Sequence, residues 1–227
     1  MVLKYYSTPF IRGGSAIVAL TLAELKLPFE HIILDMHAME HKKSEYVAMH
    51  PFGQAPLIDD DGFIVYESRA ICRYLIEKYP NQGPHLLPKG LKERTLVEQA
   101  AAVEYATFQP ALAAVLSEAL GKPARGQPVD QGVLDQALKE LSTKLDVYEV
   151  ILGKHKFLAG NDNSDPAPFE QEFTFADLCH YAYAPMLASA GIEIMTRKGP
   201  NFTRWWNELM TRPTWVKLKA DGYKGKS

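Results

Sequence analysis

The sequence lacks the features that mark secreted and membrane proteins. It has only two cysteines, Cys72 and Cys179, which lie far apart and form no CxxC motif. No apolar run approaches the roughly 20 residues that a membrane-spanning helix needs. The N-terminus shows none of the charged start, apolar core and cleavage site of a signal peptide. We therefore expect a cytoplasmic protein that keeps its thiols reduced and contacts no membrane.

A strong charge of one sign and a cluster of metal ligands are also missing. The formal net charge is only -2 across 227 residues, so no polyanionic partner such as nucleic acid is indicated. His37 and His41 stand four residues apart but lack a nearby third ligand, which argues against a metal site. The run Asp59–Asp61 lacks the alternating ligand spacing of a calcium loop, and with Gly62 after it a hairpin turn is favoured.

Residues 1–80 alternate short strand-like and helix-like segments, which is typical of an α/β domain. In chain order the segments are a strand at Val2–Tyr6, a helix at Ser15–Leu25, a strand at Phe29–Leu34, a hairpin of Leu57–Asp59 and Phe63–Tyr66, and a helix at Ser68–Tyr79. The last helix carries its apolar residues on one side. The order βαβ-ββα predicts a small mixed sheet with helices packed on it.

A linker and a second domain follow. Pro80–Lys89 holds three prolines and one glycine, so we place a linker at 81–89. Residues 90–227 are helical in pattern and predict an all-α domain, with the clearest apolar stripe at Gly132–Leu152. A longer helical stretch at Leu91–Leu120 should kink or split at Pro110.

Two local features of this second domain are also predicted. Thr174 and Asp177 have the spacing of a capping box, with Asp in place of the usual Glu. The polar segment 161–172 and the basic tail 217–227 are expected to be exposed, the tail as a frayed terminus.

Three short stretches of the first domain carry residues suited to hold an extended peptide with charged ends. Ser68 and the first amides of its helix offer a site for a carboxylate, and Glu67 beside them can take an ammonium group. His41 and Lys42 can hold a carboxylate at the other end. A cis bond at Ala55-Pro56 would turn the Ala55 backbone outward to pair with the peptide. Taken singly, Glu67-Ser68 is equally well a helix cap, and His41-Lys42 a solvated turn.

Together, these stretches resemble a known family. Glu40–Lys43, His50–Pro56 and Tyr66–Ile71 are similar to the glutathione site of phi-class glutathione transferases of plants and fungi. Arg212–Trp215 and Phe173–Leu178 resemble motifs in the helical domain of the same superfamily. The resemblance covers essentially the whole chain, although the C-terminal motifs mark the superfamily more than the class.

The resemblance implies a fold and a set of glutathione ligands. It implies a thioredoxin-like glutathione-binding domain at 1–80 and, at 90–227, a helical domain that carries the site for a hydrophobic substrate. The implied ligands are His41 and Lys42 for the glycyl carboxylate, Gln54 and the Ala55 backbone for the cysteinyl part, and Glu67 and Ser68 for the γ-glutamyl end. Ala55 stands where the family usually has Val, a mild change because its contact is made through the backbone.

The first loop departs from the family pattern. Phi-class members carry a catalytic Ser after the first strand, and the matched position here is Arg12. The bound thiol must lose its proton, because the thiolate is the nucleophile. Three candidates for stabilising it stay open: the Arg12 guanidinium, the hydroxyl of Ser15, and the backbone amides of Gly13 and Gly14 at a helix start. Ser15 could instead be the N-cap of that helix.

The resemblance implies conjugation of glutathione, as co-substrate, to a hydrophobic electrophile. The alternative is a weakly catalytic or non-catalytic glutathione-dependent carrier of hydrophobic ligands. Peroxide or thiol–disulfide chemistry ranks lower, since no Cys lies near the first loop. We expect the second substrate near Tyr105, Phe108 and Gln109, and a homodimer with Phe52 in its interface.

Overall fold

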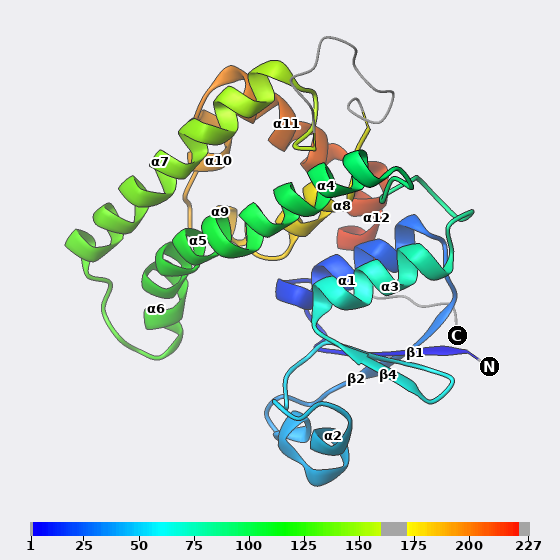
Figure 1. The fold of residues 1–227 in the computed structure, drawn as a ribbon. Coiled ribbons are helices and arrows are strands. Elements are labelled where there is room, and N and C mark those ends of the chain that lie inside the picture. Colours follow the sequence, from blue (N-terminus) through cyan, green and yellow to red (C-terminus); the bar gives the residue numbers. More distant parts are fainter. Residues whose placement is uncertain (1, 160–171, 223–227) are drawn as a thin grey trace. The chain divides into compact units, whose positions relative to one another are not determined.

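The structure, a computed structural model, describes residues 2–159 and 172–222. These residues divide into two compact units (Figure 1). One comprises the described parts of Met1–Leu86 and Arg212–Ser227, and the other is Leu87–Thr211. Residues 161–171 of the predicted exposed segment 161–172, and residues 223–227 of the predicted frayed tail 217–227, lie outside the described residues.

The first unit is built around a four-stranded mixed sheet. Its strands are β1 (Leu3–Ser7), β2 (Phe29–Ile33), β3 (Leu57–Asp60) and β4 (Phe63–Tyr66), in the order β2-β1-β3-β4. β1 pairs parallel with β2 and antiparallel with β3, and β3 pairs antiparallel with β4. Asp61 and Gly62 between β3 and β4 have φ of 58° and 88°, which confirms the predicted hairpin because such two-residue turns need positive φ.

Helices cover both faces of this sheet (Figure 1). α1 (Gly13–Glu24) and α3 (Ser68–Lys78) lie together on one face. The short α2 (Ser44–Met49), which follows the 3-10 turn η1 (Glu40–Lys42), lies on the other. α1 is apolar around its circumference and almost wholly buried, as expected for a helix covered on several sides. The predicted order of strands and helices in this unit is confirmed.

The C-terminal helix α12 (Pro213–Asp221) belongs to the first unit, although the sequence places it in the helical domain at 90–227. It packs on α1. Arg212 donates from Nε and Nη2 to both carboxylate oxygens of the buried Glu24, at 2.5 and 2.9 Å. The predicted frayed tail is therefore helical up to Asp221. Periodicity shows that a helix has an apolar face but not which domain covers it.

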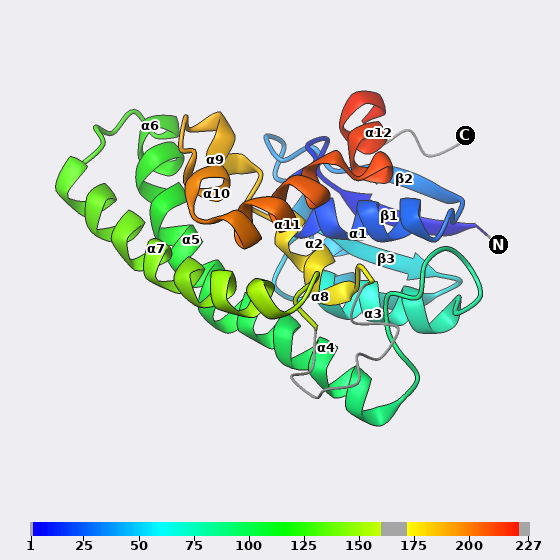
Figure 2. The ribbon, with the colours of Figure 1, turned by 90° about the horizontal axis from the view of Figure 1, so that it is seen from above.

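The second unit is entirely helical among its described residues (Figure 2). Its elements are α4 (Leu91–Val103), the π-helical turn η2 (Glu104–Phe108), α5 (Gln109–Leu116), the π-helical turn η3 (Ser117–Gly121), α6 (Lys122–Ala124), α7 (Gln131–Lys154), α8 (Phe175–Leu178), the 3-10 turn η5 (Cys179–Tyr181), α9 (Met186–Ser189), α10 (Ile194–Arg197) and α11 (Pro200–Thr211). α7 runs alongside α4 and α5.

Two predictions about this unit have a clear outcome. The interruption at Pro110 is a π-helical turn just before it, which lets the helical path continue past a residue that has no N–H to donate. The capping box is confirmed, since Thr174 N donates to Asp177 Oδ2 at 3.0 Å. Asp177 Oδ1 also accepts from Trp205 Nε1 at 2.8 Å, so the same carboxylate ties α11 to α8.

Candidate active site

Three stretches that are far apart in the sequence meet at the start of α1. A Cβ added to Gly14 would lie 2.8 Å from Ser68 Oγ and 3.1 Å from Pro56 Cδ. These separations are shorter than ordinary contacts, so α1 approaches both residues as closely as only glycine permits. The first loop, the Gln54–Pro56 motif and the Glu67-Ser68 motif therefore border one place in the first unit.

Glu67 and Ser68 form the sharp entry into α3. Glu67 has φ 69° and ψ 108°, a conformation that costs a non-glycine residue about 1–3 kcal/mol and is typical of functional sites. Its side chain is exposed and makes no capping hydrogen bond within the described chain, which removes the helix-cap explanation for Glu67. Ser68 is buried in the first turn, where helix amides have no intrahelical partner. A carboxylate thus stands beside the N–H groups of a helix N-terminus, the pair of groups that a zwitterionic ligand needs.

His41 and Lys42 lie against the loop that carries Gln54. Gly53 has φ 54°, and a Cβ there would lie 2.6 Å from the carbonyl oxygen of His41. Lys42 Nζ donates to the carbonyl oxygen of Phe52 at 3.0 Å. His41 is 9% exposed, and its buried Nδ1 has no hydrogen-bond partner among the described residues. A solvated turn is therefore wrong for His41, and an unpaired buried nitrogen favours a ligand contact.

The backbone between these stretches is fixed as predicted. The Ala55-Pro56 bond is cis. The hydroxyl of Tyr46 donates to the carbonyl oxygen of Gln54 at 2.7 Å. The Ala55 N–H has no hydrogen-bond partner in the described part of the chain, so it is a donor available to a ligand.

The sequence assigned no role to Tyr46, and none to His50 beyond its place in the stretch His50–Pro56; the two residues lie four positions apart around the end of α2. His50 is 2% exposed, and its ring stacks on Tyr66 with centroids 4.6 Å apart. Burial lowers the pKa of His50, although the charge of Glu67 acts in the opposite direction. The signal that could have found both was two polar aromatics at helical spacing just before the Gln54 motif.

The first loop holds the catalytic candidates in different surroundings. Arg12 is the N-cap of α1, and its exposed guanidinium lies 4.6 Å from the centroid of the Phe10 ring, in a cation–π contact. Ser15 lies inside the helix and is buried, and its carbonyl oxygen accepts from Tyr5 at 2.8 Å. Ser15 is therefore not the N-cap of the helix. The amides of Gly13 and Gly14 occupy the first turn.

Neither cysteine nor metal chemistry is apparent in the described residues. Cys72 is fully buried, as predicted, and burial raises the pKa of its thiol to about 12. No group of three or more His, Cys, Asp or Glu side chains in residues 2–159 and 172–222 is placed to hold a metal ion. In the same residues, none of the helices combines the length and apolarity needed to cross a membrane.

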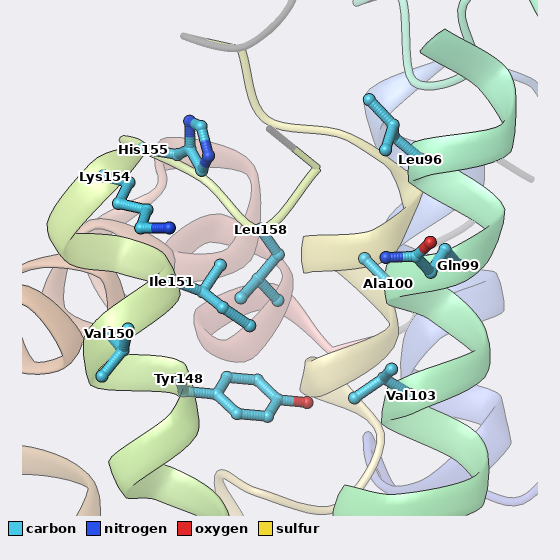
Figure 3. A pocket seen from close by; sticks show the side chains of 10 residues that line it. All are labelled: Leu96, Gln99, Ala100, Val103, Tyr148, Val150, Ile151, Lys154, His155 and Leu158. Carbon is cyan, nitrogen blue, oxygen red and sulfur yellow. The ribbon is translucent and has the colours of Figure 1, made fainter. Parts of the chain in front are cut away.

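The helical unit contains a separate apolar pocket of about 300 Å³ between α4 and α7 (Figure 3). Tyr148 points across it toward Val103, and Ile151 and Leu158 lie between the two helices. The residues expected to line the second-substrate site do not line this pocket: Phe108 is buried against Tyr148 and Tyr105 is exposed.

Comparison with known proteins agrees with this geometry. Residues 1–77 match the family "Glutathione S-transferase, N-terminal domain", and residues 108–213 match "Glutathione S-transferase, C-terminal domain". The chain therefore belongs to the glutathione S-transferase family, and glutathione is its co-substrate.

Individual relatives place it near the phi class. Glutathione S-transferase F9 of Arabidopsis thaliana is 36% identical, over 97% of each chain. Glutathione S-transferase hmp2 of the fungus Hypomyces subiculosus is 36% identical, over 97% of this chain and 99% of its own. The solved glutathione S-transferase-I with bound lactoylglutathione is 31% identical with a TM-score of 0.85, covering 97% of this chain and 99% of its own.

Proposed function

We propose that this glutathione transferase binds glutathione along the first unit and conjugates its thiolate to a hydrophobic electrophile. In this assignment Glu67 and Ser68 hold the γ-glutamyl end, Ala55 pairs with the cysteinyl backbone beside Gln54, and His41 and Lys42 hold the glycyl carboxylate. The observation that carries it is the close approach of Gly14 to Ser68 and Pro56. A solved relative binds a glutathione derivative, lactoylglutathione, which supports the ligand class.

We further propose that the first turn of α1 stabilises the thiolate in place of the family's serine. Gly13 and Gly14 form the first turn of α1. Gly14 lies next to Ser68 and Pro56, and a helix N-terminus attracts negative charge. The Arg12 guanidinium adds a weaker, solvent-screened attraction from its position over Phe10. Ser15 contributes least, because it is buried within the helix.

The rival function, a glutathione-dependent carrier, differs from a transferase in turnover. The experiment is to measure conjugation of 1-chloro-2,4-dinitrobenzene together with the affinity for glutathione. We expect saturable turnover whose KM for glutathione agrees with the measured affinity. Tight binding without turnover would favour the carrier.

We also propose that the protein is a cytoplasmic homodimer. Phe52 is 66% exposed, on a loop whose backbone is held by Lys42. An exposed phenyl ring fits an apolar hollow on a second copy, and the α4–α7 pocket with the exposed Val150 at its edge offers one. Two buried free cysteines are compatible with a reducing compartment. Phe52→Asp should give monomers in sedimentation, and an unchanged dimer would exclude Phe52 from the interface.

A further inference from the structure

Tyr46 combines a buried ring with a single directed hydrogen bond. It is 4% exposed, in α2, and its ring packs with Leu34 and Leu57 in a core cluster of the first unit. Its hydroxyl donates to the carbonyl oxygen of Gln54 at 2.7 Å. Burial raises the pKa of Tyr46, so the hydroxyl keeps its proton at neutral pH and remains a donor.

The carbonyl that Tyr46 holds belongs to the same peptide unit as the N–H of Ala55. The one cis bond in the described chain is Ala55-Pro56, so the Gln54–Ala55 peptide is trans. In a planar trans peptide the C=O and the N–H point in opposite directions. Fixing the Gln54 carbonyl toward α2 therefore fixes the Ala55 N–H away from α2, and this N–H has no partner in the described residues.

We propose that Tyr46 is a positioning residue that aims the Ala55 N–H at the cysteinyl backbone of glutathione. This inference rests on the proposed function, since it assumes that Ala55 pairs with glutathione. A hydrogen bond to the carbonyl also polarises the peptide, which makes its N–H a better donor. In this role Tyr46 affects the affinity for glutathione and not the pKa of its thiol, because the Tyr46 hydroxyl donates to the backbone carbonyl of Gln54.

The alternative is that Tyr46 matters only as part of the core. A buried tyrosine commonly finds some acceptor for its hydroxyl, and the ring alone fills the space beside Leu34 and Leu57. A purely structural role predicts lower stability with unchanged glutathione affinity in the folded protein. The positioning role predicts weaker affinity with an unchanged turnover number.

The test is Tyr46→Phe in the full chain, with Tyr74→Phe as the matched control. Tyr74 is a tyrosine of the same unit whose hydroxyl donates to Asp60 at 2.5 Å, away from Gln54. We expect Tyr46→Phe to raise the Kd and KM for glutathione about five- to tenfold, the equivalent of one lost hydrogen bond. We expect kcat with 1-chloro-2,4-dinitrobenzene to stay within about twofold, and Tyr74→Phe to leave the affinity unchanged.

An unchanged Kd in folded Tyr46→Phe would overturn the inference, and so would an equal loss in Tyr74→Phe. If Tyr46→Phe does not fold, fluorinated tyrosines at position 46 keep the ring and make the hydroxyl a stronger donor. Affinity should then rise with hydroxyl acidity, and a flat series would overturn the inference. Failure of the proposed function is separate, because the unmodified protein would then bind no glutathione at all.

Discussion

The stretch from Glu40 to Pro56 and the loop from Thr8 to Arg12 are built in different ways. In the first stretch, side chains of one segment hold the backbone of another: Lys42 binds the carbonyl of Phe52 and Tyr46 that of Gln54. In the loop, the N–H of Arg12 and the hydroxyl of Thr8 both donate to the carbonyl of Phe10, at 3.0 and 3.3 Å.

The difference shows which part of the site is free to change. A side chain that binds the backbone of another segment is hard to replace without moving that backbone, and in the stretch from Glu40 to Pro56 the residues resemble the family motif. A loop whose hydrogen bonds join only neighbouring residues can change a side chain while the backbone of the rest of the site stays in place. We therefore expect glutathione recognition to follow the family pattern and thiol activation to depart from it.

The largest expected effect comes from replacing the two residues at the proposed γ-glutamyl end of the glutathione site. Glu67→Ala with Ser68→Ala should abolish retention on immobilised glutathione, because losing paired charged contacts costs about 2–5 kcal/mol. Ser44→Ala with Glu45→Ala is the control, since these exposed residues are also a serine and a glutamate at the start of a helix, α2. Normal retention by a folded Glu67/Ser68 variant would disprove the assignment of this end.

A second change tests the close contact of Gly14, in the first turn of α1, with Ser68. Gly14→Ala would put a methyl group 2.8 Å from Ser68 Oγ, so we expect a loss of about 1–3 kcal/mol in the free energy of unfolding, measured in urea, and weaker glutathione binding. Gly132→Ala is the control, because its nearest neighbour would be Asp130 Oδ1 at 3.4 Å, an ordinary contact. Equal stability of the two variants would show that the close approach is unimportant.

A third set of changes separates the groups of the first loop. If the α1 amides are the main cause of activation, Arg12→Ala should raise the thiol pKa of bound glutathione by less than about one unit, and Ser15→Ala by less still. Arg12→Ser restores the family's residue and should raise conjugating activity. A rise of one unit or more in Arg12→Ala would transfer the main role to the guanidinium. Activation lost only in Ser15→Ala would identify Ser15 as the catalytic residue.

The smallest expected effect concerns His50 and pH. Burial lowers the pKa of His50 in the folded protein, so the unfolded state binds the proton more readily. The stability that this neutral histidine contributes is fully present above its unfolded pKa of about 6.5 and declines as pH falls through the folded value. His50→Asn should flatten this decline in urea unfolding below pH 6.5 while leaving the slope above pH 7 unchanged. An identical decline in the variant would assign it to other groups.

The sequence predicted the secondary-structure elements and the backbone motifs of the site better than the side-chain contacts between them. Periodicity and motifs were enough for the chain order of strands and helices in the first unit, the hairpin and the cis bond at Ala55-Pro56. They could not show that Arg212 pairs with Glu24, because that contact joins residues 188 positions apart. They also missed Tyr46. The sequence pattern of a tyrosine on an apolar helix face does not reveal whether its hydroxyl donates to water or to the backbone of another segment, here the carbonyl of Gln54.

The most direct test of thiol activation without the family's serine is the thiol pKa of glutathione bound to the unmodified protein. It can be followed by the ultraviolet absorbance of the thiolate as pH is raised, with free glutathione as the reference. We predict a pKa clearly below the free value of about 8.5–9, because the proposed site places the thiol at the positive end of α1. A pKa equal to that of free glutathione would contradict the account and favour a carrier of glutathione and hydrophobic ligands.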